Sequence, residues 1–263
     1  MKIGFIGLGN MGGSLARLIA QDERYRSDLL LANRSRDKTE KIAAEVGGQP
    51  VSNEEVFAQA EVIFLGIKPA QFTDLLPDYQ EILDKRDSIL MVSMAAGLTL
   101  ELLEKLTPSH HRWIRIMPNT PVAVGEGVIT YSLSQQANQV DEDLLRELLS
   151  SAGLLVKLEE KQLDAATALA GCGPAFVYLF IEALADAGVR AGLSRDISLE
   201  LANQTLLGAA KLSQVSGQHP AQLKDQVCSP AGSTIAGVAS LEENAFRGRS
   251  WMPFRLLTRG RRN

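Results

Sequence analysis

Gly7-Leu8-Gly9-Asn10-Met11-Gly12 follows an apolar segment, Lys2–Ile6, that we expect to form a strand, and it opens a helical pattern over Met11–Gln21. A G-x-G-x-x-G sequence in that position is typical of a turn that binds the pyrophosphate of a dinucleotide. Gly7 allows the tight turn, Gly9 lets the backbone approach the phosphates, and Gly12 lets the helix pack on the strand. The helix N-terminus offers unpaired N–H groups to the phosphates. A glycine-rich turn without a ligand is the alternative, and the order of strand and helix argues against it.

Short β-rich apolar segments alternate with helical patterns as far as about residue 160. Such alternation is typical of a doubly wound, mostly parallel sheet with helices on both faces. We therefore expect a Rossmann-type α/β domain over residues 1–160. The expected strands are Lys2–Ile6, Asp28–Ala32, Glu61–Gly66, Ser88–Ser93, Trp113–Met117, Gly127–Tyr131 and Gly153–Lys157, and the expected helices are Met11–Gln21, Asp37–Glu45, Asn53–Gln59, Thr99–Leu106 and Asp141–Ser151.

Beyond Lys161 the strand signal ends, and segments rich in Ala, Leu and Gly at helical spacing follow. We expect an all-helical second domain over residues 161–263, whose core would be thin unless it packs on a second copy of the chain. The longest apolar run, Ala165–Ile181, is short for a membrane span and is expected to form a buried helix pair. The expected helices are Gly173–Ala187, Arg195–Ser216, Pro220–Val227 and Thr234–Glu243.

The composition is that of a globular protein, with 45% hydrophobic and 22% charged residues. A net charge of -4 argues against nucleic acid or an anionic membrane as a general partner. The two cysteines are too few for a disulfide framework, and no metal-ligand spacing involves them. Without an apparent secretory signal, this indicates a cytoplasmic protein that acts on a small molecule and holds no metal. Six arginines gather near the C-terminus, as a solvated extension or an interaction arm: Arg247, Arg249, Arg255, Arg259, Arg261 and Arg262.

The end of the second expected strand bears on the choice of cofactor. Asn33-Arg34-Ser35 stands where an NAD-preferring site usually carries Asp or Glu for the ribose 2′-hydroxyl. Asn33 and Ser35 can donate hydrogen bonds, and Arg34 supplies a planar cation suited to a 2′-phosphate. NADP(H) is therefore favoured, while use of NAD(H) remains open. An exposed loop arginine without a ligand is the alternative for Arg34.

Three further segments end expected strands at the carboxyl edge of the sheet, where ligands bind in doubly wound folds. They are Gly66-Ile67-Lys68-Pro69, Ser93-Met94-Ala95-Ala96-Gly97 and Arg115-Ile116-Met117-Pro118-Asn119-Thr120-Pro121. Small residues there leave space for a flat ring. Lys68 is either a solvated edge charge or a contact with the cofactor.

Cys228-Ser229-Pro230-Ala231-Gly232-Ser233-Thr234 precedes an apolar helical segment. With Ser229 as the N-cap and Pro230 in the first turn, it would be an ordinary helix start. Alternatively, the N–H groups of residues 231–234 and three hydroxyls would bind a carboxylate. None of the histidines is expected to act as a base, because His110 and His111 lie in an expected exposed loop and His219 precedes a proline.

With these segments in hand, the chain resembles the pyrroline-5-carboxylate reductases, which reduce a cyclic imino acid to L-proline in the last step of proline biosynthesis. The resemblance runs from Met1 to about Arg247. It is carried by the glycine turn, by Gly66–Pro69, by Ala95-Ala96-Gly97 and by Met117–Pro121. The more specific blocks are Ala170-Gly171-Cys172-Gly173-Pro174-Ala175-Phe176 and Leu223-Lys224-Asp225-Gln226-Val227-Cys228-Ser229-Pro230.

The resemblance implies a C-terminal domain that dimerises through interlocking helices, with dimers often forming decamers. It also implies an active site that combines the first domain of one chain with the helices of its partner. Cofactor-binding positions would be Gly7, Gly9, Asn10, Met11, Gly12, Asn33, Arg34, Ser35, Asn53, Ile67, Lys68, Pro69, Ala95 and Ala96. Substrate-binding positions would be Ser229, Gly232, Ser233 and Thr234, and the Thr234 hydroxyl would hydrogen-bond the ring nitrogen as the catalytic contact.

Two departures from the family pattern bear on these expectations. The family usually reads Ser-Pro-Gly-Gly-Thr-Thr where this chain carries Ala231 and Ser233, so a positive φ at Ala231 would tighten the loop. In addition, Arg249–Phe254 has no helical stripe and contains a proline, so residues 249–263 are expected to form an atypical tail.

Two other functions stay open. One is a small-acid oxidoreductase of the β-hydroxyacid dehydrogenase type, against which the absence of lysine from Gly173–Ala187 counts. The other is a dinucleotide-binding protein without turnover.

Overall fold

The computed structural model describes residues 1–259, which fall into two compact units, Met1–Cys172 and the residues from Gly173 onward. The expected division at residues 160 and 161 lies earlier in the chain. Residues 163–172 belong to the first unit because they pack on it: Leu163 is fully buried, and Nδ2 of Asn119 donates to the carbonyl oxygen of Ala170 at 3.0 Å.

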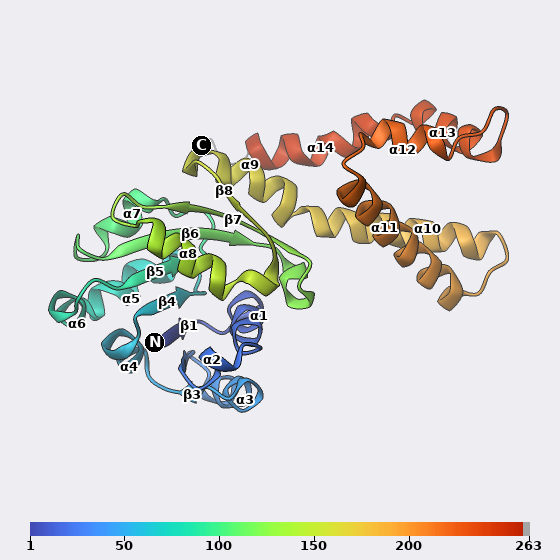
Figure 1. Ribbon diagram of the computed structural model, residues 1–263. Helices are drawn as coiled ribbons and strands as arrows, with labels where there is room; N and C mark the ends of the chain where they lie inside the picture. The colour runs from blue at the N-terminus through green and yellow to red at the C-terminus, as the bar shows by residue number, and fades with distance from the viewer. Residues whose placement is uncertain (260–263) are drawn as a thin grey trace. The chain divides into compact units, whose positions relative to one another are not determined.

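Within the described residues, the first unit is built on one eight-stranded sheet with the order β3-β2-β1-β4-β5-β6-β7-β8 (Figure 1). Neighbouring strands run parallel except for β6 and β7. This confirms the predicted doubly wound, mostly parallel sheet. The strands are β1 (Ile3–Ile6), β2 (Leu29–Ala32), β3 (Gln49–Pro50), β4 (Val62–Leu65), β5 (Leu90–Ser93), β6 (Arg112–Pro118), β7 (Gly127–Leu133) and β8 (Gly153–Lys157).

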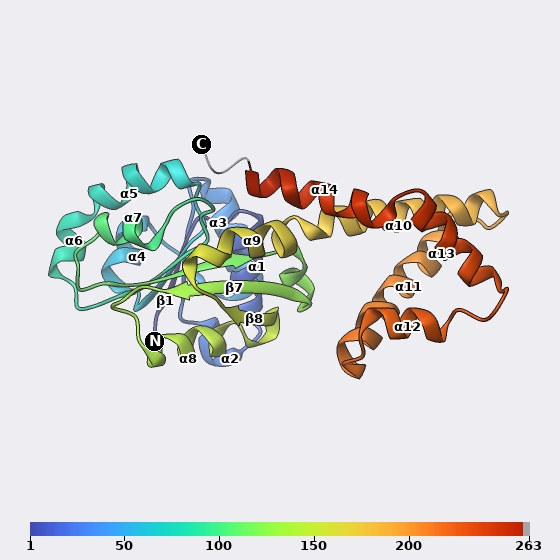
Figure 2. The same cartoon turned by 90° about the horizontal axis from the view of Figure 1, so that it is seen from above.

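Helices cover both faces of this sheet (Figures 1 and 2). Apolar residues of α1 (Asn10–Ile19), α3 (Arg36–Val46) and α8 (Gln139–Leu148) share one buried cluster with the strands. Residues of α4 (Asn53–Gln59), α5 (Phe72–Asp78), α6 (Gln80–Lys85) and α7 (Leu100–Lys105) share the other. Burial on both faces explains why the central strands read as continuous apolar runs.

Some elements were not predicted from the sequence. The edge strand β3 has only two residues and includes Pro50, which an edge position tolerates. In α5 and α6, the helical spacing of Phe72, Leu76 and Leu83 is interrupted by Pro77 and a break at Tyr79. The other additions are α2 (Glu23–Arg26), α9 (Leu163–Ala166), a π-helical turn η5 (Thr167–Gly171) and the 3-10 turns η1 (Pro69–Gln71), η2 (Thr120–Val124), η3 (Ser150–Ala152) and η4 (Glu160–Gln162).

The second unit is helical throughout its described residues, as predicted. Its elements are α10 (Gly173–Arg190), α11 (Arg195–Ser216), α12 (Pro220–Gln226), α13 (Ser233–Glu243) and α14 (Phe246–Arg259).

The expectation of a non-helical segment at Arg249–Phe254 is wrong, because α14 continues through Pro253. Two aromatic contacts hold α14 against α10: Phe246 lies on Phe180 and Phe254 meets Phe176 edge to face, with ring centroids 6.1 and 5.5 Å apart. In Figure 2 the two helices lie side by side. Packing of aromatic rings thus outweighs the backbone hydrogen bond lost at Pro253. The side chains of Arg255, Arg259, Arg261 and Arg262 lie outside the described residues.

The expectation that Ala165–Ile181 is buried is wrong for a single chain. Leu169, Tyr178 and Leu179 are exposed, and α10 buries only Ala185 fully. The stretch Glu160–Arg190 is long and apolar enough to cross a membrane by length and composition, with 11% of its most apolar window buried. Apolar helices that one chain leaves uncovered need another surface to cover them.

His111 is also placed differently from the expectation of an exposed loop. It is 1% exposed, and its Nδ1 accepts a hydrogen bond from the backbone N–H of Ile89 at 3.2 Å. Its Nε2 lies 3.1 Å from the carbonyl oxygen of Leu83, which fixes the tautomer with the proton on Nε2. Burial, with a smaller contribution from His110, lowers the pKa of His111 to about 4.

The folded state should therefore lose stability in mild acid through His111. Its pKa is lower in the folded chain than the usual 6.5, so its contribution is complete above pH 6.5 and is lost as the pH falls toward 4. We expect this one group to cost about 2 kcal/mol between pH 7 and pH 4.5. His111→Gln should flatten the pH profile of the unfolding free energy, measured by urea denaturation. An unchanged profile would contradict the assignment. His110→Gln, which removes only the smaller contribution, should flatten the profile less.

Candidate active site

The glycine turn brings three backbone segments unusually close together. Gly7 has φ +93°, and a Cβ on Gly12 would lie 2.1 Å from the carbonyl oxygen of Gly7. A Cβ on Gly66, after β4, would lie 2.5 Å from the same oxygen. By contrast, a Cβ on Gly9 would meet nothing within 4 Å. Gly7, Gly12 and Gly66 are thus required by packing, whereas Gly9 faces open space at the start of α1.

The turn can hold an anion because of where α1 begins. Gly9 is its N-cap residue, and no side chain caps the helix. The first N–H groups of α1 therefore point into the open space beside Gly9, which fits a pyrophosphate. Asn10 is exposed there, while Met11 is half-buried and packs on the core.

A hollow of about 390 Å³ lies beside the end of β2. Asn33 lines it, and Oδ1 of Asn33 accepts from the N–H of Leu8 at 3.2 Å, which links the glycine turn to β2. Ser35 is the N-cap residue of α3, and Arg34 is exposed but does not line the hollow. Asn53 is half-buried and is the first residue of α4. It does not line the hollow, but its neighbour Ser52 does. The lining consists of Asn33, Arg36, Thr39, Pro50, Val51, Ser52 and Glu55.

Arg36 was missed by the sequence analysis. It lies in the first turn of α3 and lines the hollow, and its Nε donates to Oε1 of Glu40 at 2.9 Å. Both side chains are more than half exposed, so this ion pair is weak and leaves Arg36 free to meet an anion. The sequence Arg34-Ser35-Arg36 shows two candidate arginines, but which of them faces the hollow depends on the residue at which α3 begins.

The ends of β4 and β5 form the neighbouring part of the same sheet edge. Ile67 is half-buried, and Lys68 and Pro69 are exposed. The N–H of Lys68 donates to Oε1 of Gln71 at 3.0 Å, and the N–H of Ala95 donates to Oγ of Ser93 at 3.2 Å. Ala95 is buried, and Ala96 next to it is exposed. Both segments follow strands on the β4 side of the point where the strand order reverses, between β1 and β4, where a doubly wound fold binds its ligand.

The expected substrate loop belongs to the second unit and is exposed in the single chain at Ser229, Ser233 and Thr234. Helix α13 begins at Ser233, one residue before the expected Thr234, and its N-cap residue is Gly232, so the alternative of an ordinary helix start capped by Ser229 is wrong. The N–H of Gly232 donates to the carbonyl oxygen of Ser229 at 3.0 Å and is thus not free for a ligand. The N–H groups of Ala231, Ser233 and Thr234 have no partner among the described residues. Of the four N–H groups expected at residues 231–234, the loop therefore keeps three, with three hydroxyls, for an anion.

Ala231 adopts a positive φ of +56°, in the left-handed region. This is the conformation that we expect to tighten the loop. Pro230 and Ala231 are the central residues of the turn closed by Ser229 and Gly232, and a positive φ at its third position normally calls for glycine. An L-residue there costs about 1–2 kcal/mol. Helices α12 and α13, which flank the loop, thus hold it in this shape against the backbone strain at Ala231.

The comparisons with known proteins come from both halves of the chain. The family model described as pyrroline-5-carboxylate reductase dimerisation matches residues 160–251, and that described as NADP oxidoreductase, coenzyme F420-dependent, matches residues 2–97. The pyrroline-5-carboxylate reductase of Pisum sativum is 43% identical over 248 residues, covering 94% of this chain and 89% of its own length. The chain belongs to the pyrroline-5-carboxylate reductase family.

Solved structures agree with this membership. The pyrroline carboxylate reductase of Plasmodium falciparum with NADP bound is 35% identical, with a TM-score of 0.88 over 99% of this chain and 97% of its own. A pyrroline-5-carboxylate reductase of Coxiella burnetii has a TM-score of 0.90 at 29% identity, with the same coverage. The predicted family and its class, NAD(P)H-dependent oxidoreductases, are thereby confirmed. The described residues contain no group of three or more side chains that would hold a metal ion.

The glycine turn allows two matched substitutions to separate folding from cofactor binding. Gly9→Ala adds a methyl group in open space, so we expect a wild-type melting temperature but at least about tenfold weaker NADPH binding, since the phosphates must approach that backbone. Gly12→Ala collides with the Gly7 carbonyl and should cost about 2–3 kcal/mol of stability. Thermal unfolding and fluorescence titration with NADPH measure both. Normal NADPH binding by Gly9→Ala would contradict the assigned phosphate site.

Proposed function

We propose that the chain is a pyrroline-5-carboxylate reductase that transfers hydride from NADPH to the C=N carbon of 1-pyrroline-5-carboxylate and forms L-proline. The observation that carries this proposal is the family membership over nearly the whole chain. The open space at Gly9 of the glycine turn, where the cofactor would lie, agrees with it. NADPH, when bound, supplies the hydride. The chain itself has to hold the two reactants and exclude water.

The first unit would bind the cofactor along the carboxyl edge of its sheet. Gly7, Gly9, Asn10, Met11 and Gly12 would hold the pyrophosphate. At the adenosine end, Asn33, Arg34, Ser35, Arg36 and Asn53 surround or adjoin the hollow beside β2. Ile67, Lys68, Pro69, Ala95 and Ala96 would lie along the nicotinamide. NADPH is favoured over NADH because this hollow carries an arginine where a 2′-phosphate would reach.

The substrate would lie on the loop before α13. Ser229, Ser233 and Thr234 would bind the carboxylate and the ring nitrogen through their hydroxyls, together with the free N–H groups of residues 231, 233 and 234. Gly232 would leave room for this contact, because a Cβ there would lie 2.3 Å from Oγ of Ser229. The protonated imine is already electrophilic, so orientation is the main task of these residues. The Thr234 hydroxyl would accept from the ring N–H as iminium and donate to the amine lone pair as charge leaves the ring.

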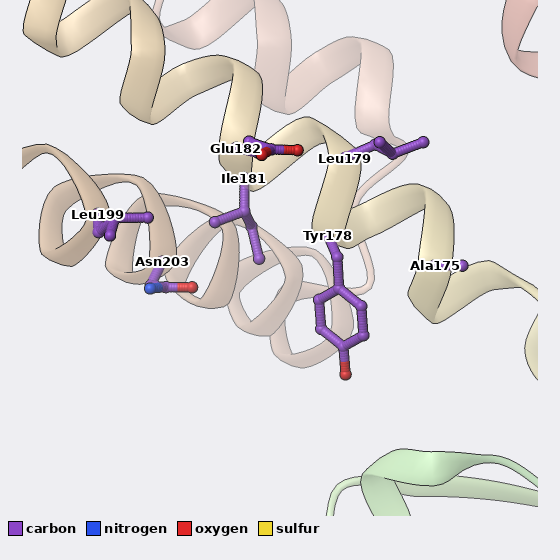
Figure 3. A pocket seen from close by; sticks show the side chains of 7 residues that line it. All are labelled: Ala175, Tyr178, Leu179, Ile181, Glu182, Leu199 and Asn203. Carbon is purple, nitrogen blue, oxygen red and sulfur yellow. The ribbon is translucent and has the colours of Figure 1, made fainter. Parts of the chain in front are cut away.

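The helical unit would pair with a second copy of the chain, and the site would combine the first unit of one chain with the loop of its partner. A pocket of about 530 Å³ between α10 and α11 supports pairing, because its lining is mostly exposed and apolar (Figure 3). Tyr178, Leu179 and Leu199 on its walls are each more than a third exposed. We extend the proposal to a decamer of five dimers, and to a cytoplasmic enzyme that binds neither nucleic acid nor membrane.

Initial rates with the purified chain test the function. We expect oxidation of NADPH that depends on pyrroline-5-carboxylate and exceeds that of NADH, with light scattering on the same sample giving a dimer or larger. If a folded dimer binds NADPH but does not oxidise it, whichever cyclic imine is added, the chain would be a dinucleotide-binding protein without turnover. Activity with a β-hydroxyacid instead would favour the other dehydrogenase type.

Two arginines near the hollow can be compared directly. Arg36→Ala should raise KM for NADPH about 10- to 100-fold and leave KM for NADH nearly unchanged, because a phosphate contact with an arginine is worth about 1.5–3 kcal/mol. Arg34→Ala, the matched control two residues away, should have the smaller effect. The opposite order would assign the 2′-phosphate to Arg34, and no change in either variant would contradict an arginine contact.

Thr234→Ala tests the catalytic contact. Loss of one orienting hydrogen bond should lower kcat on the order of 10- to 1000-fold. NADPH binding, which belongs to the other unit, should stay at the wild-type value, so fluorescence titration serves as the control. Full turnover with unchanged substrate affinity would exclude this role for Thr234.

A further inference from the structure

A buried arginine, Arg115, lies within the sheet of the first unit. Its side chain is 4% exposed, and on β6 it is in register with Ser93 of β5 and Ser132 of β7. Its Nε is buried and has no hydrogen-bond partner among the described residues. A charged group with an unsatisfied donor usually stabilises a fold less than an apolar side chain of similar size. Packing alone thus does not account for an arginine at this position.

The guanidinium of Arg115 binds carboxylates in the segment that follows β8. Its Nη1 donates to Oε1 of Glu160 at 3.1 Å, and its Nη2 lies 3.5 Å from Oδ1 of Asp164. Glu160 begins η4, and Asp164 lies in α9. The shorter distance makes Glu160 the stronger hydrogen-bond partner of Arg115.

The same oxygen of Glu160 also holds the backbone of the turn after β5. The N–H of Leu100 donates to Oε1 of Glu160 at 2.7 Å. At the other end of this turn, the N–H of Ala95 donates to Oγ of Ser93, the register neighbour of Arg115. Side chains beside Arg115 therefore fix both ends of residues 94–99. Ala95 and Ala96, which we place along the nicotinamide, lie in this turn.

We propose that Arg115 is a positioning residue for hydride transfer, which acts through Glu160 to fix the turn 94–99 against the nicotinamide. The inference rests on the proposed function. Arg115 would contact no reacting atom, and its effect would be on the separation and alignment of the donor and acceptor carbons. A misplacement of about 1 Å costs on the order of 100-fold in rate.

Two substitutions of the same kind on one strand test this. Arg112, at the start of β6, pairs with Asp141, whose side chain is 2% exposed, so Arg112→Met removes an ion pair with a buried carboxylate three residues earlier on the same strand. We expect Arg115→Met to lower kcat about 10- to 100-fold, with the dissociation constant of NADPH within about threefold of wild type. Arg112→Met should lower the melting temperature but keep kcat.

The kinetic isotope effect distinguishes positioning from partial unfolding. With NADPH deuterated at the transferred position, the isotope effect on kcat should rise in Arg115→Met, because hydride transfer becomes more rate-limiting. A smaller folded fraction would lower the rate without changing this ratio. An isotope effect equal to that of wild type together with a lowered kcat would therefore overturn the proposal, as would an unchanged kcat.

Variants of Glu160 keep the test decisive if Arg115→Met does not fold, because the Glu160 side chain is 29% exposed and tolerates change better. Glu160→Gln retains an oxygen that accepts from Leu100 and should keep kcat within about threefold, whereas Glu160→Ala should fall about 10- to 100-fold. Equal rates for both variants would overturn the role of Glu160. If wild type itself fails to oxidise NADPH with pyrroline-5-carboxylate, the proposed function fails instead.

Discussion

The carbonyl oxygen of Gly7 sets how closely the backbone segments at the centre of the first unit can approach. Side chains at Gly12 or Gly66 would place a Cβ within 2.1 or 2.5 Å of this oxygen, so α1 and the end of β4 pack on β1 only because both positions are glycine. β1 and β4 are neighbours at the point where the strand order reverses, and a doubly wound fold binds its ligand there. One steric constraint thus shapes both the fold and the crevice.

Strand β6 and Asn119, the residue directly after it, have a second organising role, because their polar side chains tie distant parts of the first unit together. Arg115 reaches Glu160, and Asn119 bridges two backbones, accepting from Val128 at 2.8 Å and donating to Ala170 at 3.0 Å. The residues just before α10 are therefore fastened to the segment that follows β6 at the carboxyl edge of the sheet. Buried polar contacts of this kind are costly when incomplete and rigid when satisfied, which suits a segment whose position has to be reproducible.

Local patterns predicted what local forces determine. The glycine turn, the apolar strands and the capped helix at Asn53 are each encoded within a few consecutive residues, and they lie where the sequence placed them, within a residue or two. Contacts between distant residues left no such pattern. No sequence pattern near Arg115 predicts its contact with Glu160. Likewise, no pattern near His111 predicts that it is buried with its Nε2 against the carbonyl oxygen of Leu83. For α14, the sequence pattern around Pro253 pointed away from a helix that ring contacts with α10 support.

The uncovered apolar faces of α10 and α11 also make the helical unit sensitive to how much protein is present. Tyr178, Leu179 and Leu207 are each more than half exposed in one chain, so their burial has to come from association. Free energy gained by association follows mass action, and the unit therefore becomes less stable on dilution. A newly synthesised chain has no partner at first, so the apolar faces of α10 and α11 are exposed and can aggregate or bind chaperones. The fraction of folded helical unit in the cell thus depends on the concentration of the protein itself.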